Sequence, residues 1–319
     1  MIIIQADLYD RAKAVFDAST LELTPVAYGN EKTMLDLAKA KGVRVFIIGA
    51  EKYSDDFYKS IDASSLIVRF GVGYNAVPIA LCKERGTRVA FTPGTLDASV
   101  AEHTMALILA CARHVAKKHA EMRENTWAFE TGMELADKTI AVIGFGNIGR
   151  RVASIARNGF GMRIHAFDRM SALAPEHAPL ADAYFSSWEE AVSEAHIVSL
   201  HLAVTDTTKK FLDSKRIDAM RSDAILINTG RGALVNEADL YDALAAKRIA
   251  SAGIDVFTEE PYAPVPGKDF RTLSNIVLTP HLGSNTDAAN RRMAEACVKS
   301  AKAFISADMG GVTLIPEMK

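Results

Sequence analysis

Apolar runs alternate with stretches of helical composition along roughly the first 97 residues of the chain. The runs that we expect to form strands are Ile2–Ile4, Arg44–Ile48, Leu66–Val68 and Arg88–Phe91. The stretches that we expect to form helices are Tyr9–Ala18, Met34–Lys41 and Pro78–Glu84. Strands that are separated by helices are typical of a parallel sheet with crossover connections. The pattern therefore predicts one small α/β domain in this part of the chain.

A second alternation follows a long predicted helix that runs from about Ala98 to Glu124. Its expected strands are Thr139–Ile143, Arg163–Phe167, His196–Leu200, Ala224–Ile227, Ala252–Ile254 and Ile276–Leu278. A closing helix is expected at Ala288–Ile305. A length of 319 residues suits two domains of about 150 residues each, so we expect two α/β domains that are joined by helices.

Composition and charge argue against several classes of partner. The chain has 37 basic and 39 acidic residues, a net charge of -2, and it has no basic run, so we expect neither nucleic-acid nor membrane binding. The three cysteines, at 82, 111 and 297, have no metal-ligand spacing, which favours free thiols and no metal site. The apolar start, Met1–Ile4, is too short for a signal-peptide core. We therefore expect a cytoplasmic protein.

A glycine motif directly follows one of the expected strands and opens a helix at Asn147–Asn158. Its glycines are Gly144, Gly146 and Gly149. The first permits a tight turn, the second lets the backbone approach a pyrophosphate, and the third allows close packing of helix on strand. The helix N-terminus offers free N–H groups to phosphates. The motif predicts a dinucleotide site, and a turn that binds nothing, an FAD site and an S-adenosylmethionine site are the alternatives.

An acidic residue stands where such a site needs one. Asp168 ends the next expected strand, 19 residues after Gly149. A carboxylate at this place accepts hydrogen bonds from the ribose hydroxyls of the adenosine and repels the extra phosphate of NADP. NAD is therefore the expected cofactor. The neighbouring Arg169 is also a candidate cofactor contact, and its positive charge weakens the preference for NAD over NADP.

Three later segments carry further chemistry. They are Asn228–Val235, Gly253–Pro261 and Thr279–Ser284. Together with the glycine motif and Val100–Thr104, they resemble the D-isomer-specific 2-hydroxyacid dehydrogenases, such as phosphoglycerate dehydrogenases and glyoxylate or hydroxypyruvate reductases. The resemblance implies a Rossmann-type doubly wound parallel sheet domain and a smaller flavodoxin-like α/β domain, with a cleft between them. It implies that residues 98–287 form the NAD-binding domain, and that residues 1–97 form the substrate-binding (catalytic) domain, completed by 288–319.

By this resemblance Arg231, Glu260 and His281 are the catalytic residues, and their side chains suit the reduction of a 2-keto acid. The planar fork of Arg231 can hold the carboxylate and the carbonyl oxygen of the substrate. His281 can give a proton to the developing alkoxide, and Glu260 would orient it and stabilise the imidazolium. The alternative interpretations without a catalytic role are that Arg231 is an ordinary surface arginine, that His281 only packs, and that Glu260 is a solvated loop acid. The neighbouring Glu259 is the rival of Glu260, but the family places its acid directly before the proline.

The remaining site residues follow from the resemblance alone. Asp255 would contact the carboxamide of the nicotinamide, although a solvated aspartate is the alternative. Additional cofactor contacts are expected at Asn147, Ile148, Thr208, Thr229, Gly230 and Gly283. Substrate contacts are expected at Arg69, Val72 and Gly73, beside Arg231. The chain departs from the family pattern at Ala203, where a proline is usual, and at Asn75–Ala76, where an Asp-Asn pair is common, so the substrate itself is not specified.

The predicted function is therefore the NAD-dependent interconversion of a 2-keto acid and a D-2-hydroxy acid, in an enzyme that the family leads us to expect as a homodimer. A non-catalytic NAD(H)-sensing interaction protein on the same fold, like the family's transcriptional corepressors, is the alternative. Formate or phosphite oxidation is a second rival, but formate dehydrogenases of the family carry Gln in place of Glu260. An L-specific lactate or malate dehydrogenase would share the glycine motif without Arg231, Glu260 and His281 in this order.

Overall fold

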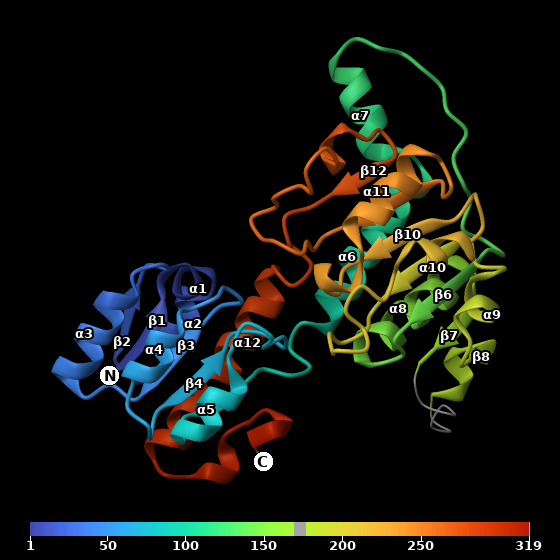
Figure 1. Ribbon diagram of the computed structural model, residues 1–319. Helices are drawn as coiled ribbons and strands as arrows, with labels where there is room; N and C mark the ends of the chain where they lie inside the picture. The colour runs from blue at the N-terminus through green and yellow to red at the C-terminus, as the bar shows by residue number, and fades with distance from the viewer. Residues whose placement is uncertain (169–176, 319) are drawn as a thin grey trace. The chain divides into compact units, whose positions relative to one another are not determined.

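The computed structural model describes residues 1–168 and 177–318, so the predicted cofactor contact Arg169 lies outside the described residues. The chain divides into two compact units (Figure 1). Unit 1 consists of Met1–Leu96 and Ser284–Lys319, and unit 2 consists of Asp97–Gly283. Within the described residues, no helix is long and apolar enough to cross a membrane.

Unit 1 is built on a parallel sheet of five strands in the order β2-β1-β3-β4-β5. This is the order typical of flavodoxin-like folds, as the resemblance implied. The strands are β1 (Ile2–Gln5), β2 (Leu23–Val26), β3 (Val45–Ile48), β4 (Leu66–Arg69) and β5 (Arg88–Ala90). The helices are α1 (Ala6–Arg11), α2 (Lys13–Ala18), α3 (Glu31–Lys41), α4 (Asp55–Ser60), α5 (Ile79–Arg85) and α12 (Asp287–Ile305), with short 3-10 turns at Met309–Gly311 and Pro316–Met318.

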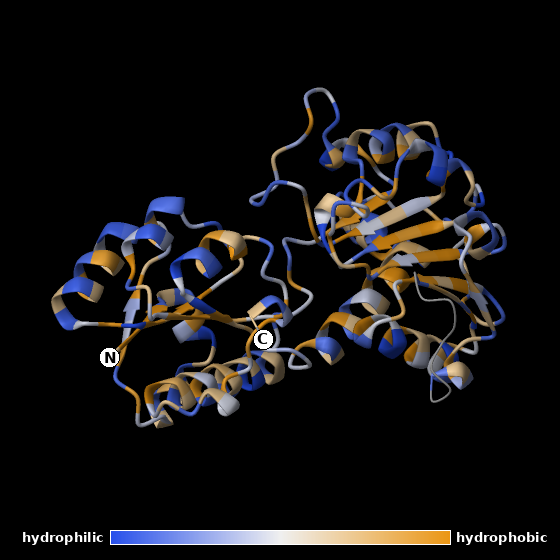
Figure 2. Ribbon diagram, turned by 60° about the horizontal axis from the view of Figure 1, so that its bottom comes forward, coloured by the Kyte–Doolittle hydropathy of each residue, from blue (hydrophilic) through white to orange (hydrophobic). Residues whose placement is uncertain are grey.

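The central strands of unit 1 are buried on both faces, which is why they appear in the sequence as continuous apolar runs rather than as alternating ones. β1, β3 and β4 are buried at every position. Figure 2 shows them as hydrophobic ribbons between helices whose outer surfaces are hydrophilic. The last long helix, α12, returns from the C-terminal part of the chain and packs against β4. The C-terminal segment thus completes the small unit.

Unit 2 contains a parallel sheet of seven strands in the order β12-β11-β10-β9-β6-β7-β8. Numbered within the unit, this is the 3-2-1-4-5-6 order of the Rossmann fold with one strand added. The strands are β6 (Thr139–Ile143), β7 (Arg163–Phe167), β8 (Ala183–Phe185), β9 (Ile197–Leu200), β10 (Ile225–Asn228), β11 (Ser251–Ile254) and β12 (Ile276–Leu278). The helices are α6 (Asp97–Ala112), α7 (Val115–Arg123), α8 (Asn147–Phe160), α9 (Trp188–Val192), α10 (Ser214–Asp218) and α11 (Glu237–Ala245), with 3-10 turns at Ala178–Leu180, Gly232–Leu234 and Phe270–Thr272.

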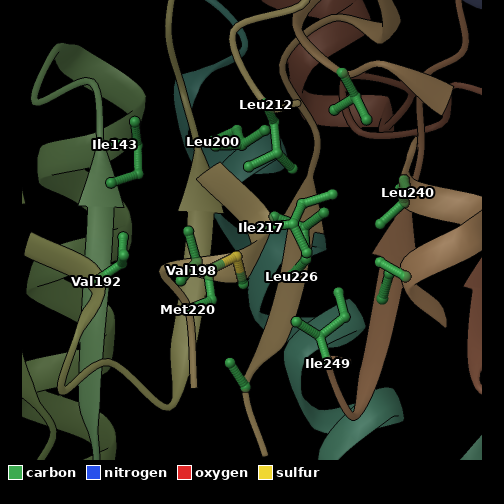
Figure 3. Close-up of a cluster of buried hydrophobic side chains, with 14 of the residues drawn as sticks. Ile143, Val192, Val198, Leu200, Leu212, Ile217, Met220, Leu226, Leu240 and Ile249 are labelled. Carbon is green, nitrogen blue, oxygen red and sulfur yellow. The ribbon is translucent and has the colours of Figure 1, made fainter. Parts of the chain in front are cut away.

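The unit 2 sheet separates two apolar cores, because successive side chains of a strand point to opposite faces. On one face, Val198 and Leu226 pack with Ile217 and Leu240 from α10 and α11 (Figure 3). On the other face, strand residues such as Ile197 pack with side chains of α6 and α8. The two cores leave the ends of the strands for polar residues, and those ends carry the predicted site.

The expected strands are confirmed to within one residue at each end, and the errors have clear physical causes. The expected helix from Ala98 to Glu124 is two helices, because His114 adopts a left-handed backbone with φ 53° between α6 and α7. The expected helix from Tyr9 to Ala18 is likewise interrupted at Ala12. Sequence patterns missed β2 and β8, each of which is a short, partly exposed strand at one edge of its sheet. The pattern also missed the short helices α4, α9, α10 and α11.

Candidate active site

The predicted cofactor and catalytic residues of unit 2 gather at one edge of its sheet. All strands of this sheet are parallel, so their carboxyl ends meet at the same edge. Open α/β sheets bind their ligands at this edge, at the point where the strand order reverses. In unit 2 this point lies between β6 and β9. The residues that directly follow its seven strands are Gly144, Asp168, Ser186, His201, Thr229, Asp255 and Thr279.

The glycine motif forms the turn that the sequence predicted. Gly144 has φ +97°, and a Cβ on it would lie 2.7 Å from the carbonyl carbon of His201. A Cβ on Gly149 would lie 2.1 Å from the carbonyl oxygen of Gly144, so this glycine is what lets α8 pack against β6. A Cβ on Gly146 would meet no atom within 4 Å. The first and third glycines are therefore required by the fold itself, whereas the second leaves open space.

This turn fits a dinucleotide. Gly146 caps α8 without a side-chain hydrogen bond, so the free N–H groups of the first helical turn remain available to an anion. The next two predicted contacts, Asn147 and Ile148, begin the helix. Asp168 accepts a hydrogen bond of 2.8 Å from the N–H of Phe145, which holds its carboxylate beside the turn. Arg150 braces the same turn by donating to the Phe145 carbonyl at 2.8 Å.

Two further predicted cofactor contacts are held by neighbouring backbone or side chains. The Thr208 hydroxyl donates to the Ala203 carbonyl at 2.7 Å and accepts from the Thr205 N–H at 2.7 Å, which closes the loop after β9. Thr229 is buried, and its hydroxyl lies 2.8 Å from that of Thr104 on α6. Both threonines lie in segments that follow strands of the sheet, and their contacts with the cofactor stay predictions.

Arg231 lies in a tight turn after β10. Asn228 holds this turn from both sides, since its side chain accepts from the Gly230 N–H at 3.1 Å and donates to the Arg231 carbonyl at 3.0 Å. A Cβ on Gly232 would lie 1.9 Å from the carbonyl carbon of Phe257, so the turn packs directly against the loop after β11. Burial lowers the pKa of Arg231, and the negative charge of Glu260 opposes that change. The guanidinium nevertheless remains charged.

His281 and Glu260 form the closest pair of titratable groups at this edge. The Nδ1 atom of His281 lies 2.7 Å from Oε2 of Glu260, and 33% and 35% of the two side chains are exposed. The other carboxylate oxygen of Glu260 accepts from the Phe257 N–H at 3.0 Å. Burial acts to raise the pKa of Glu260, but the hydrogen bond from His281, the Phe257 N–H and the charge of Arg231 lower it below its ordinary value. Glu260 is therefore an anion that faces the imidazole.

Asp255 and Gly283 are joined by a hydrogen bond. The Asp255 carboxylate is 1% exposed and accepts from the Gly283 N–H at 2.9 Å. It also accepts from the Leu282 N–H at 2.8 Å and from the Thr279 hydroxyl at 2.6 Å. The carboxylate is thus engaged with the loop that carries His281, and the predicted contact of Asp255 with a nicotinamide stays a prediction.

The three substrate contacts that were predicted outside unit 2 lie at the carboxyl end of β4 of unit 1, which ends at Arg69. Arg69 is 7% exposed, and its guanidinium donates to the carbonyl of Phe70, the next residue. A Cβ on Gly71, which has φ +142°, would lie 2.9 Å from Nη1 of Arg69. The Gly71 N–H donates to the Thr92 hydroxyl at 3.0 Å, which fixes the loop to the end of the neighbouring strand. Val72 and Gly73 follow and are partly exposed.

Sequence reasoning missed the residues that hold the site together. Asn228 begins one of the recognised segments and Arg150 directly follows the glycine motif, so their positions gave a signal that they belong to the site, but no role was expected for them. His103 lies inside the segment Val100–Thr104, and its ring nitrogen Nε2 lies 3.1 Å from the hydroxyl of Thr279. Among residues 1–168 and 177–318, no group of three or more His, Cys, Asp or Glu side chains is arranged to hold a metal ion.

Comparisons with known proteins show which family this chain resembles. The family model described as "D-isomer specific 2-hydroxyacid dehydrogenase, NAD binding domain" matches residues 105–283. A hydroxypyruvate reductase of Thermotoga maritima is 36% identical over 249 residues, which are 76% of this chain and 78% of that protein. A glyoxylate reductase structure from Paecilomyes thermophila has a TM-score of 0.86 at 25% identity, and the match covers 100% of this chain and 98% of that one.

A D-lactate dehydrogenase structure from Aquifex aeolicus, complexed with NAD and lactic acid, has a TM-score of 0.82 at 25% identity and covers 99% of both chains. The matched model is that of an NAD-binding domain, so the expected cofactor, NAD, is confirmed. The architecture of two parallel α/β sheets agrees with these solved structures. The chain therefore belongs to the D-isomer-specific 2-hydroxyacid dehydrogenase family.

Proposed function

We propose that this enzyme reduces a small 2-keto acid of the glyoxylate and hydroxypyruvate class to the D-2-hydroxy acid, with NADH as the reductant. The observation that carries the proposal is the 2.7 Å contact between His281 and Glu260 at the ligand-binding edge of unit 2. The substrate class rests on the relatives that are named glyoxylate and hydroxypyruvate reductases.

His281 is the proton donor of this proposal. Because the Glu260 carboxylate accepts a hydrogen bond at Nδ1, that nitrogen carries a hydrogen and Nε2 is left to exchange the catalytic proton. NADH, when bound, supplies the hydride to the carbonyl carbon. The carbonyl oxygen takes the proton from His281, so the products are the 2-hydroxy acid, NAD⁺ and a neutral imidazole. Glu260 stabilises the imidazolium before the transfer and fixes the plane of the ring.

Arg231 binds the carboxylate and the carbonyl oxygen of the substrate. Its guanidinium can form two parallel hydrogen bonds to two oxygens, which orients the carbonyl and stabilises the negative charge that develops there. Unit 1 is the substrate-binding domain of this proposal. Arg69, Val72 and Gly73 add contacts to the substrate carboxylate, because a chain that is rich in glycine lets backbone N–H groups approach an anion closely.

NAD is held by the turn and loops of unit 2. The pyrophosphate binds to the N-terminus of α8, where Gly146 leaves open space. Asp168 binds the adenosine ribose and disfavours NADP. The remaining contacts come from the other predicted residues, which are Gly144, Asn147, Ile148, Gly149, Thr208, Thr229, Gly230, Asp255 and Gly283.

The enzyme is a homodimer in this proposal, and the partner is a second copy that covers the apolar surface of α7 and the segment after it. Figure 1 shows this segment projecting from the rest of unit 2. It carries four large exposed apolar side chains, which are Val115, Met122, Trp127 and Phe129. Trp127 and Phe129 are 75% and 90% exposed, and such clusters mark interaction surfaces. Replacing both with Ser should give a monomer by light scattering, and an unchanged mass would contradict this assignment.

We also place the enzyme in the cytoplasm. Its three cysteines, Cys82, Cys111 and Cys297, are all free and buried. Free thiols are typical of proteins that work in a reducing compartment. Fractionation of the cells that express the protein, with activity measured in each fraction, tests the location directly, and activity that follows the membrane or secreted fraction would contradict it.

Oxidation of NADH and NADPH against a panel of 2-keto acids tests the activity. The panel contains glyoxylate, hydroxypyruvate, pyruvate and 3-phosphohydroxypyruvate, and His281→Ala is measured beside the wild-type enzyme. We expect turnover with NADH that falls by a factor on the order of 10² or more in the variant. If NADH binds but no keto acid turns over, the chain acts as an NAD(H)-sensing interaction protein instead.

A further inference from the structure

The catalytic loop, Thr279–Gly283, holds His281 in a backbone conformation that histidine rarely adopts. His281 has φ 55°, in the left-handed region, where a residue with a Cβ is strained. Such a conformation persists only when neighbouring bonds fix it. The bonds that fix His281 therefore decide where its imidazole points.

Asp255 supplies these bonds from a single position after β11. Its carbonyl accepts from the His281 N–H at 2.8 Å. Its carboxylate accepts from the N–H groups of Leu282 and Gly283 at 2.8 and 2.9 Å. Three consecutive N–H groups thus converge on one buried residue. Burial acts to raise the pKa of Asp255, but the hydrogen bonds from His103, Thr279 and the two backbone groups lower it, so the carboxylate is an anion.

His103 and Thr279 hold the carboxylate itself. The Thr279 hydroxyl donates to Oδ1 of Asp255 at 2.6 Å, and Nε2 of His103 lies 3.2 Å from the same oxygen and 3.1 Å from the hydroxyl oxygen. The hydroxyl hydrogen is already given to Asp255, and an ionised carboxylate only accepts. Nε2 of His103 therefore carries a hydrogen and donates to this pair.

His103 connects the catalytic loop to a rigid helix. It belongs to α6, a 16-residue helix whose side chains pack into the core of unit 2. Its side chain is 20% exposed, and a Cβ on Gly283 would lie 3.7 Å from the ring. The mechanism proposed above gives His103 no contact with substrate, although the ring reaches the loop that carries the proton donor.

We propose that His103 is a positioning residue, which donates from Nε2 to the Thr279–Asp255 pair and thereby fixes the left-handed backbone at His281. This inference rests on the proposed acid–base role of His281. Loosening the loop misplaces the imidazole, and a displacement on the order of 1 Å of a reacting group can cost about 10² in rate. The loss should fall on kcat, because the loop would still allow cofactor and substrate to bind.

Two amide variants separate positioning from simple packing. The amide nitrogen of His103→Gln reaches about as far as Nε2, whereas that of His103→Asn reaches only as far as Nδ1. We expect kcat of His103→Asn to fall about tenfold or more, with KM for NADH and for the keto acid within about threefold of wild type. We expect His103→Gln to keep kcat within about threefold of wild type. Both variants are polar, so their melting temperatures serve as a check on folding.

Three outcomes would overturn this proposal. The first is wild-type kcat in His103→Asn, and the second is an equal loss in the Asn and Gln variants, which would mean that the Nε2 donor does not matter. The third is a rise in KM for NADH in place of the fall in kcat, which would assign His103 to cofactor binding. His281→Ala is measured in parallel: if it retains wild-type turnover, the proposed function fails, whereas its collapse beside a normal His103→Asn removes only the positioning role.

Discussion

The two parallel sheets of this NAD-dependent dehydrogenase present different groups where their strands end. After β10, β11 and β12 of unit 2, the side chains of Arg231, Glu260 and His281 project from loops that are held by Asn228 and Asp255. At the end of β4 in unit 1, the guanidinium of Arg69 folds back on the carbonyl of Phe70, and Gly71, Val72 and Gly73 follow. Charged side chains thus follow the three strands of unit 2, whereas a glycine-rich backbone follows β4 of unit 1.

This difference indicates which edge should contribute to the chemical step and which to substrate binding. A charged, hydrogen-bonded side chain stabilises charge that develops during the reaction, so its loss lowers kcat. A backbone loop recognises an anion that is already present in the ground state, so its loss raises KM. Substitutions at the two edges should therefore separate into effects on kcat and effects on KM, and the predictions below test this separation.

The largest effect is expected at Arg231. Replacing it with Lys keeps the charge but removes the planar fork, so two parallel hydrogen bonds to the substrate cannot form. We expect kcat for the keto acid to fall by a factor of about 10²–10³. Arg221→Lys is the matched control, because Arg221 bonds to Asp223 at 2.7 Å on the surface of the same unit. Equal kcat of the Arg231→Lys and Arg221→Lys variants in steady-state assays would contradict the assignment of the unit 2 edge to the chemical step.

A smaller effect is expected at Glu260. Glu260→Gln retains a hydrogen-bond acceptor for His281 but loses the charge that stabilises the imidazolium, so kcat for reduction should fall by a factor of about 10–10². Glu259→Gln, at the exposed neighbour, is the control and should keep kcat. The pKa of Glu260 lies below its ordinary value, so the carboxylate is ionised throughout pH 5–8. The ratio of wild-type kcat to variant kcat should therefore stay constant between pH 5 and pH 8. It should decline only at lower pH, where the Glu260 carboxylate becomes protonated.

Unit 1 should respond in KM instead. Arg69→Met keeps much of the apolar length of the side chain and removes the guanidinium, so we expect KM for the keto acid to rise about tenfold with kcat within about threefold of wild type. Arg88→Met, at an exposed position of β5, is the control for loss of one charge in the same sheet. A collapse of kcat in Arg69→Met at unchanged KM would show that this edge also takes part in the chemical step.

Much of the fold and of the site could be predicted because the decisive features are local in sequence. Buried parallel strands such as β3 are continuous apolar runs, and the glycine motif, Arg231 and His281 each begin within three residues of the end of a strand. The edge strand β2 escaped prediction because it is short, half exposed and contains Pro25. A proline lacks the N–H group that a central strand needs, so it argues against a strand when only the sequence is known.

The hydrogen bonds that hold the site together could not be predicted from the sequence, because their partners are far apart along the chain. His103 and Thr279 are 176 positions apart, and Thr104 and Thr229 are 125 positions apart. Nothing in the local pattern around His103 distinguishes a donor to a buried carboxylate from a histidine that only packs. The folded chain brings α6 beside the ends of β10 and β12, and only then does the hydrogen-bond partner of each group become defined.

The smallest predicted effect concerns a second histidine at the unit 2 edge, which sharpens the contrast with His281. Nε2 of His201 lies 2.8 Å from the Ser199 hydroxyl, and the backbone carbonyl of His201 packs closely against Gly144. Withdrawal of its ring from water lowers its pKa to about 4. A histidine whose pKa is lower in the folded protein than in the unfolded chain stabilises the fold when it is neutral. This contribution to the free energy of unfolding is fully present above the pKa of the unfolded chain, near 6.5, and is lost as the pH falls toward the folded pKa.

The free energy of unfolding of the wild-type protein should therefore fall by about 1 kcal/mol between pH 7.5 and 5.5, and that of His201→Gln should not. This loss corresponds to a few degrees in melting temperature. Thermal unfolding of both proteins at the two pH values measures the difference, and a matched pair of scans at pH 7.5 and 9 should show none. Parallel loss in both proteins would mean that His201 titrates normally. The polar edge of unit 2 would then be more open to water than its hydrogen bonds indicate, and the distinction between a histidine kept neutral for packing and one paired with Glu260 for proton transfer would fail.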